Sequence, residues 1–206
     1  EVIYHITQAF DYYVDIGDSI SAVRTARERV VPVVGDRTLR RILERALKLA
    51  DSDSIDYGWI VERIAEQTFF AEGDREGARV YYERATRIAE SKNDHHLLAR
   101  VYSDWANMEY FAGSSQLVLN LSHRAIELTD SGRFPFPLLL AHGRACEAEM
   151  FMVARHQDAV EHVVAQRSIC DRTRLFRGVG HLKSQIWSQL IGDWDTARNH
   201  GDRALA

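Results

Sequence analysis

The sequence holds nine histidines and two cysteines, the side chains most often used for acid–base, nucleophilic or metal chemistry. His95 and His96 are neighbours in "NDHHLL" (93–98), so on a helix they point in different directions. The stretch "VEHVV" (160–164) comes nearest to a zinc-protease motif, and it lacks a second His at helical spacing. Cys146 has no His or acid at a spacing that would activate its thiol. We therefore predict no catalytic residue, no metal site and no cofactor, and we expect that the chain is not an enzyme.

Two runs of basic residues, "RTLRR" (37–41) and "RTRLFR" (172–177), have the composition to contact phosphate. Acidic residues lie close to both runs, and the formal net charge of the chain is −4. We therefore interpret the runs as solvated helix ends and expect no contact with nucleic acid, which requires a clear basic excess.

The composition, with 46% hydrophobic residues and only 3 Pro in 206 residues, is typical of a globular helical chain. No apolar run approaches the roughly 18–20 residues of a membrane span, so we expect no membrane contact. Two cysteines, Cys146 and Cys170, cannot form a disulfide framework, which favours a reducing, cytoplasmic location.

The helices that must position any functional side chain are predicted from a sequence pattern that recurs along the chain. In four stretches a turn is followed by packing residues at offsets of 5, 9 and 12, which lie on one face of a helix. These sets are Ala78, Tyr82 and Ala85 after Gly73-Asp74; Val118, Ser122 and Ala125 after Gly113-Ser114; Ala159, Val163 and Gln166 after Ala154-Arg155; and Ala197, Gly201 and Ala204 after Gly192-Asp193. A compressed copy follows Gly35-Asp36, and a further Gly-Asp pair lies at 17–18.

Each copy predicts a helical hairpin. The Gly allows a left-handed turn at the end of one helix, and the Asp or Ser beside it can cap the next helix. An amphipathic stretch precedes each turn, at 60–70, 98–111, 137–153 and 175–190. We expect the small residues to let neighbouring helices approach closely.

This pattern resembles the tetratricopeptide repeat, in which a Gly-Asp turn leads into a second helix with small residues at these offsets. The spacing between turns here is 38 to 41 residues, longer than is usual in that family, and the first-helix signature is degraded. The resemblance implies an all-α fold: a right-handed α-solenoid of about eleven antiparallel helices, forming one repeat domain over residues 1–206.

The N-terminal stretch 5–53, which has two Gly-Asp turns 18 residues apart, is similar to the repeat arm of large ATP-dependent LuxR/MalT-type bacterial transcriptional regulators. One helix, from about Ser19 to Val33, would then serve two hairpins. The ATPase and DNA-binding modules of that family have no counterpart in this sequence. We therefore expect the chain to be an excised segment of a larger multidomain protein, and we expect it to self-associate through its uncapped C-terminal hairpin.

In tetratricopeptide-like solenoids the first helices line a concave groove. Counting back ten, six and three residues from the turns places arginines, amides and aromatics on that face. The candidate groove residues are Arg63, Gln67, Phe70, Arg100, Ser103, Asn107, Tyr110, Arg144 and Phe151. Arginines can bind a carboxylate or phosphate, and amides can bind a peptide backbone or a sugar hydroxyl. The alternative is that the aromatics belong to the core and the arginines are merely solvated.

The lysine and asparagine clamp with which co-chaperone members of the family bind a C-terminal carboxylate is not matched, because lysine is missing from these positions. We expect a non-enzymatic sensor or interaction arm of a transcriptional regulator, which would bind a small-molecule inducer or a protein. The alternative is a stand-alone repeat adaptor for peptides or partner proteins.

Overall fold

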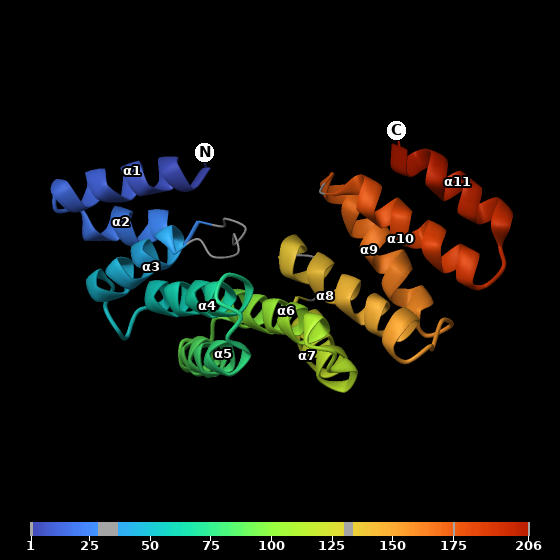
Figure 1. Cartoon of the computed structure of the whole chain (residues 1–206), viewed down its shortest axis with the longest axis horizontal. Coiled ribbons are helices and arrows are strands. Elements are labelled where there is room, and N and C mark those ends of the chain that lie inside the picture. The colour runs from blue at the N-terminus through green and yellow to red at the C-terminus, as the bar shows by residue number, and fades with distance from the viewer. Residues whose placement is uncertain (1, 29–36, 130–133, 175, 206) are drawn as a thin grey trace. The chain divides into compact units, whose positions relative to one another are not determined.

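The computed structural model describes residues 2–28, 37–129, 134–174 and 176–205 (Figure 1). Over these residues the chain forms eleven α-helices and no strand, so the predicted all-α class is confirmed. The helices are α1 Val2–Asp15, α2 Ser19–Ala26, α3 Thr38–Leu49, α4 Ile55–Phe70, α5 Arg75–Ser91, α6 His95–Phe111, α7 Ser115–Leu128, α8 Pro135–Glu147, α9 Ala159–Thr173, α10 Arg177–Leu190 and α11 Trp194–Leu205. A π-helical turn, Ala148–Met152, directly follows α8.

Packing divides the chain into two compact units, Glu1–Val101 (unit 1) and Tyr102–Ala206 (unit 2), and the boundary falls inside α6. In unit 1 each helix from α1 to α5 packs on the next along the chain. In unit 2 the same holds from α7 to α11 (Figure 1). Contacts are therefore mostly between sequence neighbours, as in a repeat protein.

The predicted turns lie between helices. Gly17, Gly73, Gly113 and Gly192 all have φ between 74° and 83°, the left-handed conformation that glycine adopts without a Cβ penalty. Ala154 takes the same place in the third of the four repeats, with a φ of 55°. The Gly35-Asp36 turn, and the expected helix beyond residue 28, lie outside the described residues; α2 ends at Ala26.

The acidic residue after each Gly acts as the cap that the sequence predicts. The carboxylates of Asp18, Asp74 and Asp193 each accept a hydrogen bond from the backbone N–H three residues later, at 2.9 to 3.1 Å. Ser114 occupies the N-cap position of α7 without a side-chain capping bond. Residue type at the turn thus fixes where α2, α5 and α11 begin.

The small-residue face is buried as predicted in three of the four repeats. All three marked residues of α5, of α7 and of α9 are buried. In α11 only Ala197 is buried, whereas Gly201 and Ala204 are half-buried.

The core of unit 1 shows how the pattern becomes packing. In α3 the apolar residues Leu39, Ile42, Leu43 and Ala46 recur at helical spacing and are all buried against residues of α1, α2 and α4. On α4, Gly58 lies so close to its neighbours that a Cβ would come within 2.7 Å of Leu97.

Candidate functional site

Three helices of unit 2 enclose a cleft with the character of a ligand site. Helices α8 and α9, and α9 and α10, pack together and leave a cavity of about 260 Å³. We call it the α8–α10 cleft. It is lined by Phe136, Leu139, Leu140, Gly143, Arg144, Glu147, Gln166, Phe176, Val179 and Lys183. Apolar walls with a few converging polar groups are typical of small-molecule sites.

A larger hollow of about 550 Å³ lies along α11, lined by Arg167, Asp195, Thr196, Asn199, His200 and Arg203. Its lining residues are all polar or charged, and no aliphatic or aromatic hydrocarbon side chain is among them. The smaller α8–α10 cleft is therefore the better candidate.

Two cations of the cleft share one carboxylate. The Lys183 ammonium lies 2.8 Å from the Glu147 carboxylate and donates to the backbone carbonyl of Gly143 at 3.2 Å. Arg144 pairs with the other oxygen of the same carboxylate. All three side chains are less than a fifth exposed, so solvent screens them only partly. The three charges sum to a net positive cleft.

Arg144 is held in place by aromatic rings. Its guanidinium carbon lies 4.7 Å from the ring centre of Tyr110 and 5.3 Å from that of Phe111, both at the end of α6. Burial, with the Glu147 carboxylate nearby, raises the pKa of Tyr110, so its phenol stays protonated.

A glycine lets the polar groups come close to the α8 backbone. A Cβ on Gly143 would lie 2.5 Å from the amide nitrogen of Gln166 and 3.0 Å from the Lys183 ammonium. The Gln166 amide donates to the carbonyl of Leu139 at 3.3 Å, and its buried carbonyl oxygen has no hydrogen-bond partner among the described residues. An unpaired buried acceptor of this kind costs about 1–3 kcal/mol.

The structure brings together two of the nine predicted groove residues, Tyr110 and Arg144. Arg63 and Gln67 are buried on α4, and Arg63 pairs with Glu66. Arg63 is thus not the solvated arginine of the alternative interpretation. Whether these residues bind a ligand stays a prediction.

The remaining predicted positions differ in exposure. Arg100 is buried, with its Nε 3.7 Å from the Glu62 carboxylate. Ser103 is buried, Phe70 and Asn107 are half-buried, and Phe151 is exposed.

No sequence pattern singles out Gly143, Glu147 or Lys183, and the repeat spacing predicts only a packing role for Gln166. One signal could have identified Gln166. It occupies the offset of 12 at which the other three repeats have Ala85, Ala125 and Ala204. A long polar side chain at a position where the other repeats have alanine indicates a specific polar contact rather than close helix packing.

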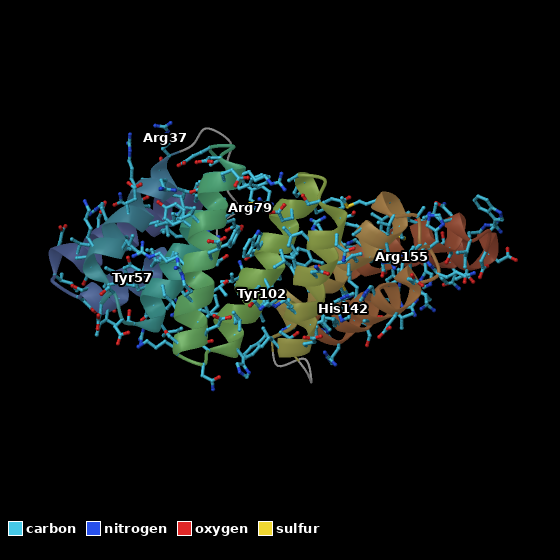
Figure 2. All side chains as sticks on the ribbon, turned by 90° about the horizontal axis from the view of Figure 1, so that it is seen from below. Arg37, Tyr57, Arg79, Tyr102, His142 and Arg155 are labelled. Carbon is cyan, nitrogen blue, oxygen red and sulfur yellow. The ribbon has the colours of Figure 1, made fainter. Side chains whose placement is uncertain are left out.

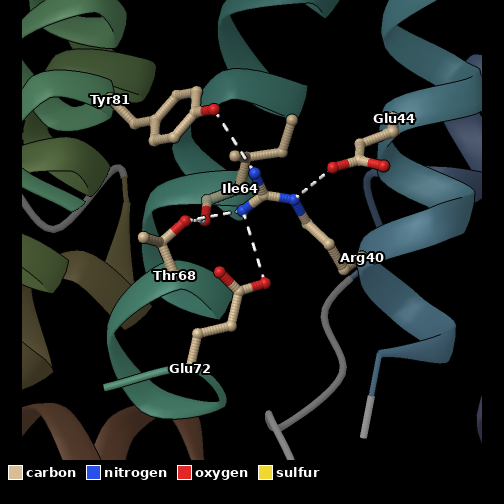
Figure 3. A network of polar contacts seen from close by, with 6 residues as sticks. All are labelled: Arg40, Glu44, Ile64, Thr68, Glu72 and Tyr81. Atoms are coloured by element: carbon tan, nitrogen blue, oxygen red, sulfur yellow. Dashed lines mark hydrogen bonds and ion pairs between the residues drawn. The ribbon is translucent and has the colours of Figure 1, made fainter. Parts of the chain in front are cut away.

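The prediction that the basic run 37–41 is solvated is wrong for Arg40. Arg40 is half-buried rather than solvated, and it joins three helices (Figure 3). Its guanidinium donates to Thr68 at 2.6 Å, to Glu44 at 2.8 Å and to Tyr81 at 3.3 Å. Because α3, α4 and α5 all contribute partners, the network stabilises unit 1.

Two pairs of histidine side chains lie in contact within unit 2. The two Nδ1 atoms of His142, labelled in Figure 2, and His162 are 2.9 Å apart, and the His123 ring lies 5.5 Å from that of His162. Burial, with His162 and His123 nearby, lowers the pKa of His142 to about 4. A second pair, His181 and His200, has its Nδ1 atoms 3.2 Å apart. Across the described chain, no group of three or more His, Cys, Asp or Glu side chains is arranged to hold a metal ion.

The two thiols are buried. Burial raises the pKa of Cys146 to about 12, so that thiol stays protonated at neutral pH.

A scan against protein-family models gives no match for this chain, and a search of the curated proteins finds none that matches it. Among the helices of the described residues, none has the length and apolar character needed to cross a membrane.

Proposed function

We propose that this chain is a non-catalytic binding segment, the sensor arm of a multidomain cytoplasmic transcriptional regulator of the LuxR/MalT type. Its helices would form a right-handed solenoid of antiparallel tetratricopeptide-like hairpins. The repeated Gly turns, the buried small-residue faces and the packing of each helix on the next support this arrangement. The observation that carries the binding role is the α8–α10 cleft, with its apolar walls and half-buried charges.

In this proposal a small inducer enters the cleft and bridges α8, α9 and α10. Its binding energy would favour one arrangement of these helices over another, and neighbouring modules would sense the shift. The alternative is a stand-alone adaptor that binds peptides. A phosphate-loop sequence before residue 1 and a helix-turn-helix after residue 206 in the gene would favour the sensor arm.

The binding role can be tested by titrating the ¹⁵N-labelled chain with separate sets of sugars, carboxylic acids and short peptides. We expect at least one compound to shift the backbone amides of Gly143, Gln166 and Lys183. Val179→Trp should abolish these shifts, because Val179 lines the cleft and an indole fills it. Val80→Trp, at an exposed valine on α5, is the matched control and should change nothing. Shifts scattered over other helices, or none at all, would contradict a binding role for the cleft.

A further inference from the structure

The charges of the α8–α10 cleft define what it can bind, and this step rests on the proposed binding function. Lys183 has three N–H donors, of which Glu147 and the Gly143 carbonyl use two. Arg144 pairs with Glu147, and in the part of the chain that the structure describes its buried Nε has no hydrogen-bond partner. Two cations with donors to spare therefore face one carboxylate. An added anion balances the net positive charge, whereas an added third cation meets net repulsion.

The rest of the cleft selects an apolar body. Phe136 and Phe176 approach edge to face with their ring centres 6.5 Å apart, and Leu139, Leu140 and Val179 complete the walls. A flat ring can pack against these side chains. The volume of about 260 Å³ lies just below the roughly 300–1,000 Å³ of sites for drug-sized ligands, so the occupant is compact.

Gln166 adds a polar preference. Its buried carbonyl oxygen has no partner within the described ranges, while its amide nitrogen already donates to Leu139. The terminal torsion of a glutamine is soft, so the amide can turn its carbonyl toward a donor on a bound molecule, giving up the 3.3 Å hydrogen bond to Leu139. A hydroxyl or N–H on the ligand would remove the cost of this unpaired acceptor.

We propose that the α8–α10 cleft binds a compact monocarboxylic acid with an aromatic or similarly flat apolar body. The carboxylate lies at Arg144 and Lys183, and the body packs against Phe136, Leu139 and Val179.

The test uses four probes: cinnamate, its neutral amide cinnamamide, the cation cinnamylamine, and acetate, which lacks the body. Each is titrated into the ¹⁵N-labelled chain while the amides of Gly143, Gln166 and Lys183 are followed. We expect cinnamate to bind with a dissociation constant on the order of 1 mM, as its few heavy atoms allow. The amide should bind about tenfold more weakly, and the amine and acetate should not bind measurably.

Lys183→Met removes the charge and keeps an apolar stem. It should weaken cinnamate binding about tenfold or more, since a charged hydrogen bond is lost, and leave cinnamamide unchanged. Glu147→Gln removes the competing carboxylate and should strengthen cinnamate binding several-fold. Arg155→Met, at an exposed arginine of unit 2 labelled in Figure 2, is the control and should alter neither probe.

Equal binding of the acid and the amide, preference for the amine, or equal weakening of both probes by Lys183→Met would overturn the proposal. If cinnamate fails while a sugar, a peptide or an amine still shifts the cleft amides, the ligand class is wrong and the binding function stands. If no compound of any class shifts them, both the ligand class and the binding function fail.

Discussion

At the residue scale, the position of a charge decides its role. Arg63 and Arg144 occupy equivalent places before their turns and look alike in the sequence. In the fold, Arg63 and its partner Glu66 have side chains less than 5% exposed. Arg144 instead lies over the rings of Tyr110 and Phe111 at the edge of a cleft. The first is a structural ion pair, and the second lines the cleft for which we propose a ligand.

Arg63→Ala should lower the free energy of unfolding by about 3 kcal/mol, because it removes the cation that pairs with the buried Glu66 carboxylate. Arg87→Ala, at an exposed position on the neighbouring helix α5, should change it by less than about 0.5 kcal/mol. Urea denaturation followed by circular dichroism measures both. Equal, small effects would show that the Arg63 pair contributes nothing to stability.

The sequence alone could indicate Arg144 but not its surroundings. Gly143, Gln166 and Lys183 come from three different helices, and no local spacing connects them. The burial of Arg63 likewise depends on tertiary neighbours rather than on helical periodicity. Side-chain environments of this kind arise only when the helices pack.

At the scale of elements, the turns carry most of the information. Helix ends could be predicted because a left-handed residue and a capping carboxylate are local requirements, met at Gly73 and Asp74 by residue type. The spacing also located the turn at Ala154, where no glycine marks it. The π-helical turn Ala148–Met152 was not predicted, because nothing in its residue types distinguishes it from an α-helix.

Two substitutions at the turns should change the stability of the chain in opposite directions. Gly73→Ala should destabilise the chain by about 1–2 kcal/mol, because a Cβ disfavours the φ of 74° although no atom blocks it. Ala154→Gly should stabilise it by about 0.5–1 kcal/mol, since relieved strain exceeds the added chain entropy. Denaturation midpoints of the two variants would measure this. A change of the same sign in both would contradict the role assigned to the turn.

At the scale of the whole molecule, stability should be modular because each helix packs mainly on the next. Removal of residues 174–206 deletes α10 and α11 and leaves the other helices with most of their neighbours. The shortened chain should keep its remaining helical circular dichroism and unfold cooperatively. Loss of helicity throughout the shortened chain would show that the C-terminal helices stabilise distant ones.

Buried histidines should make the stability of unit 2 depend on pH. Burial is the main cause that lowers the pKa of His142 to about 4 and also lowers the pKa values of His162 and His200. A histidine whose pKa is lower in the folded state binds fewer protons there than in the unfolded chain. Protonation of these histidines therefore costs no stability above a pH of about 6.5. As the pH drops from there toward 4, the free energy of unfolding decreases.

His142→Asn should make this acid dependence shallower. In the original chain, the free energy of unfolding should decrease between pH 7 and 5 by up to about 1.4 kcal/mol per pH unit for each fully titrating histidine. The variant should lose the part of that slope due to His142, whatever its stability at pH 7. His95→Asn, at an exposed histidine, should keep the original slope. Urea denaturation at several pH values gives the slopes, and identical slopes in all three chains would mean that His142 does not change protonation on unfolding.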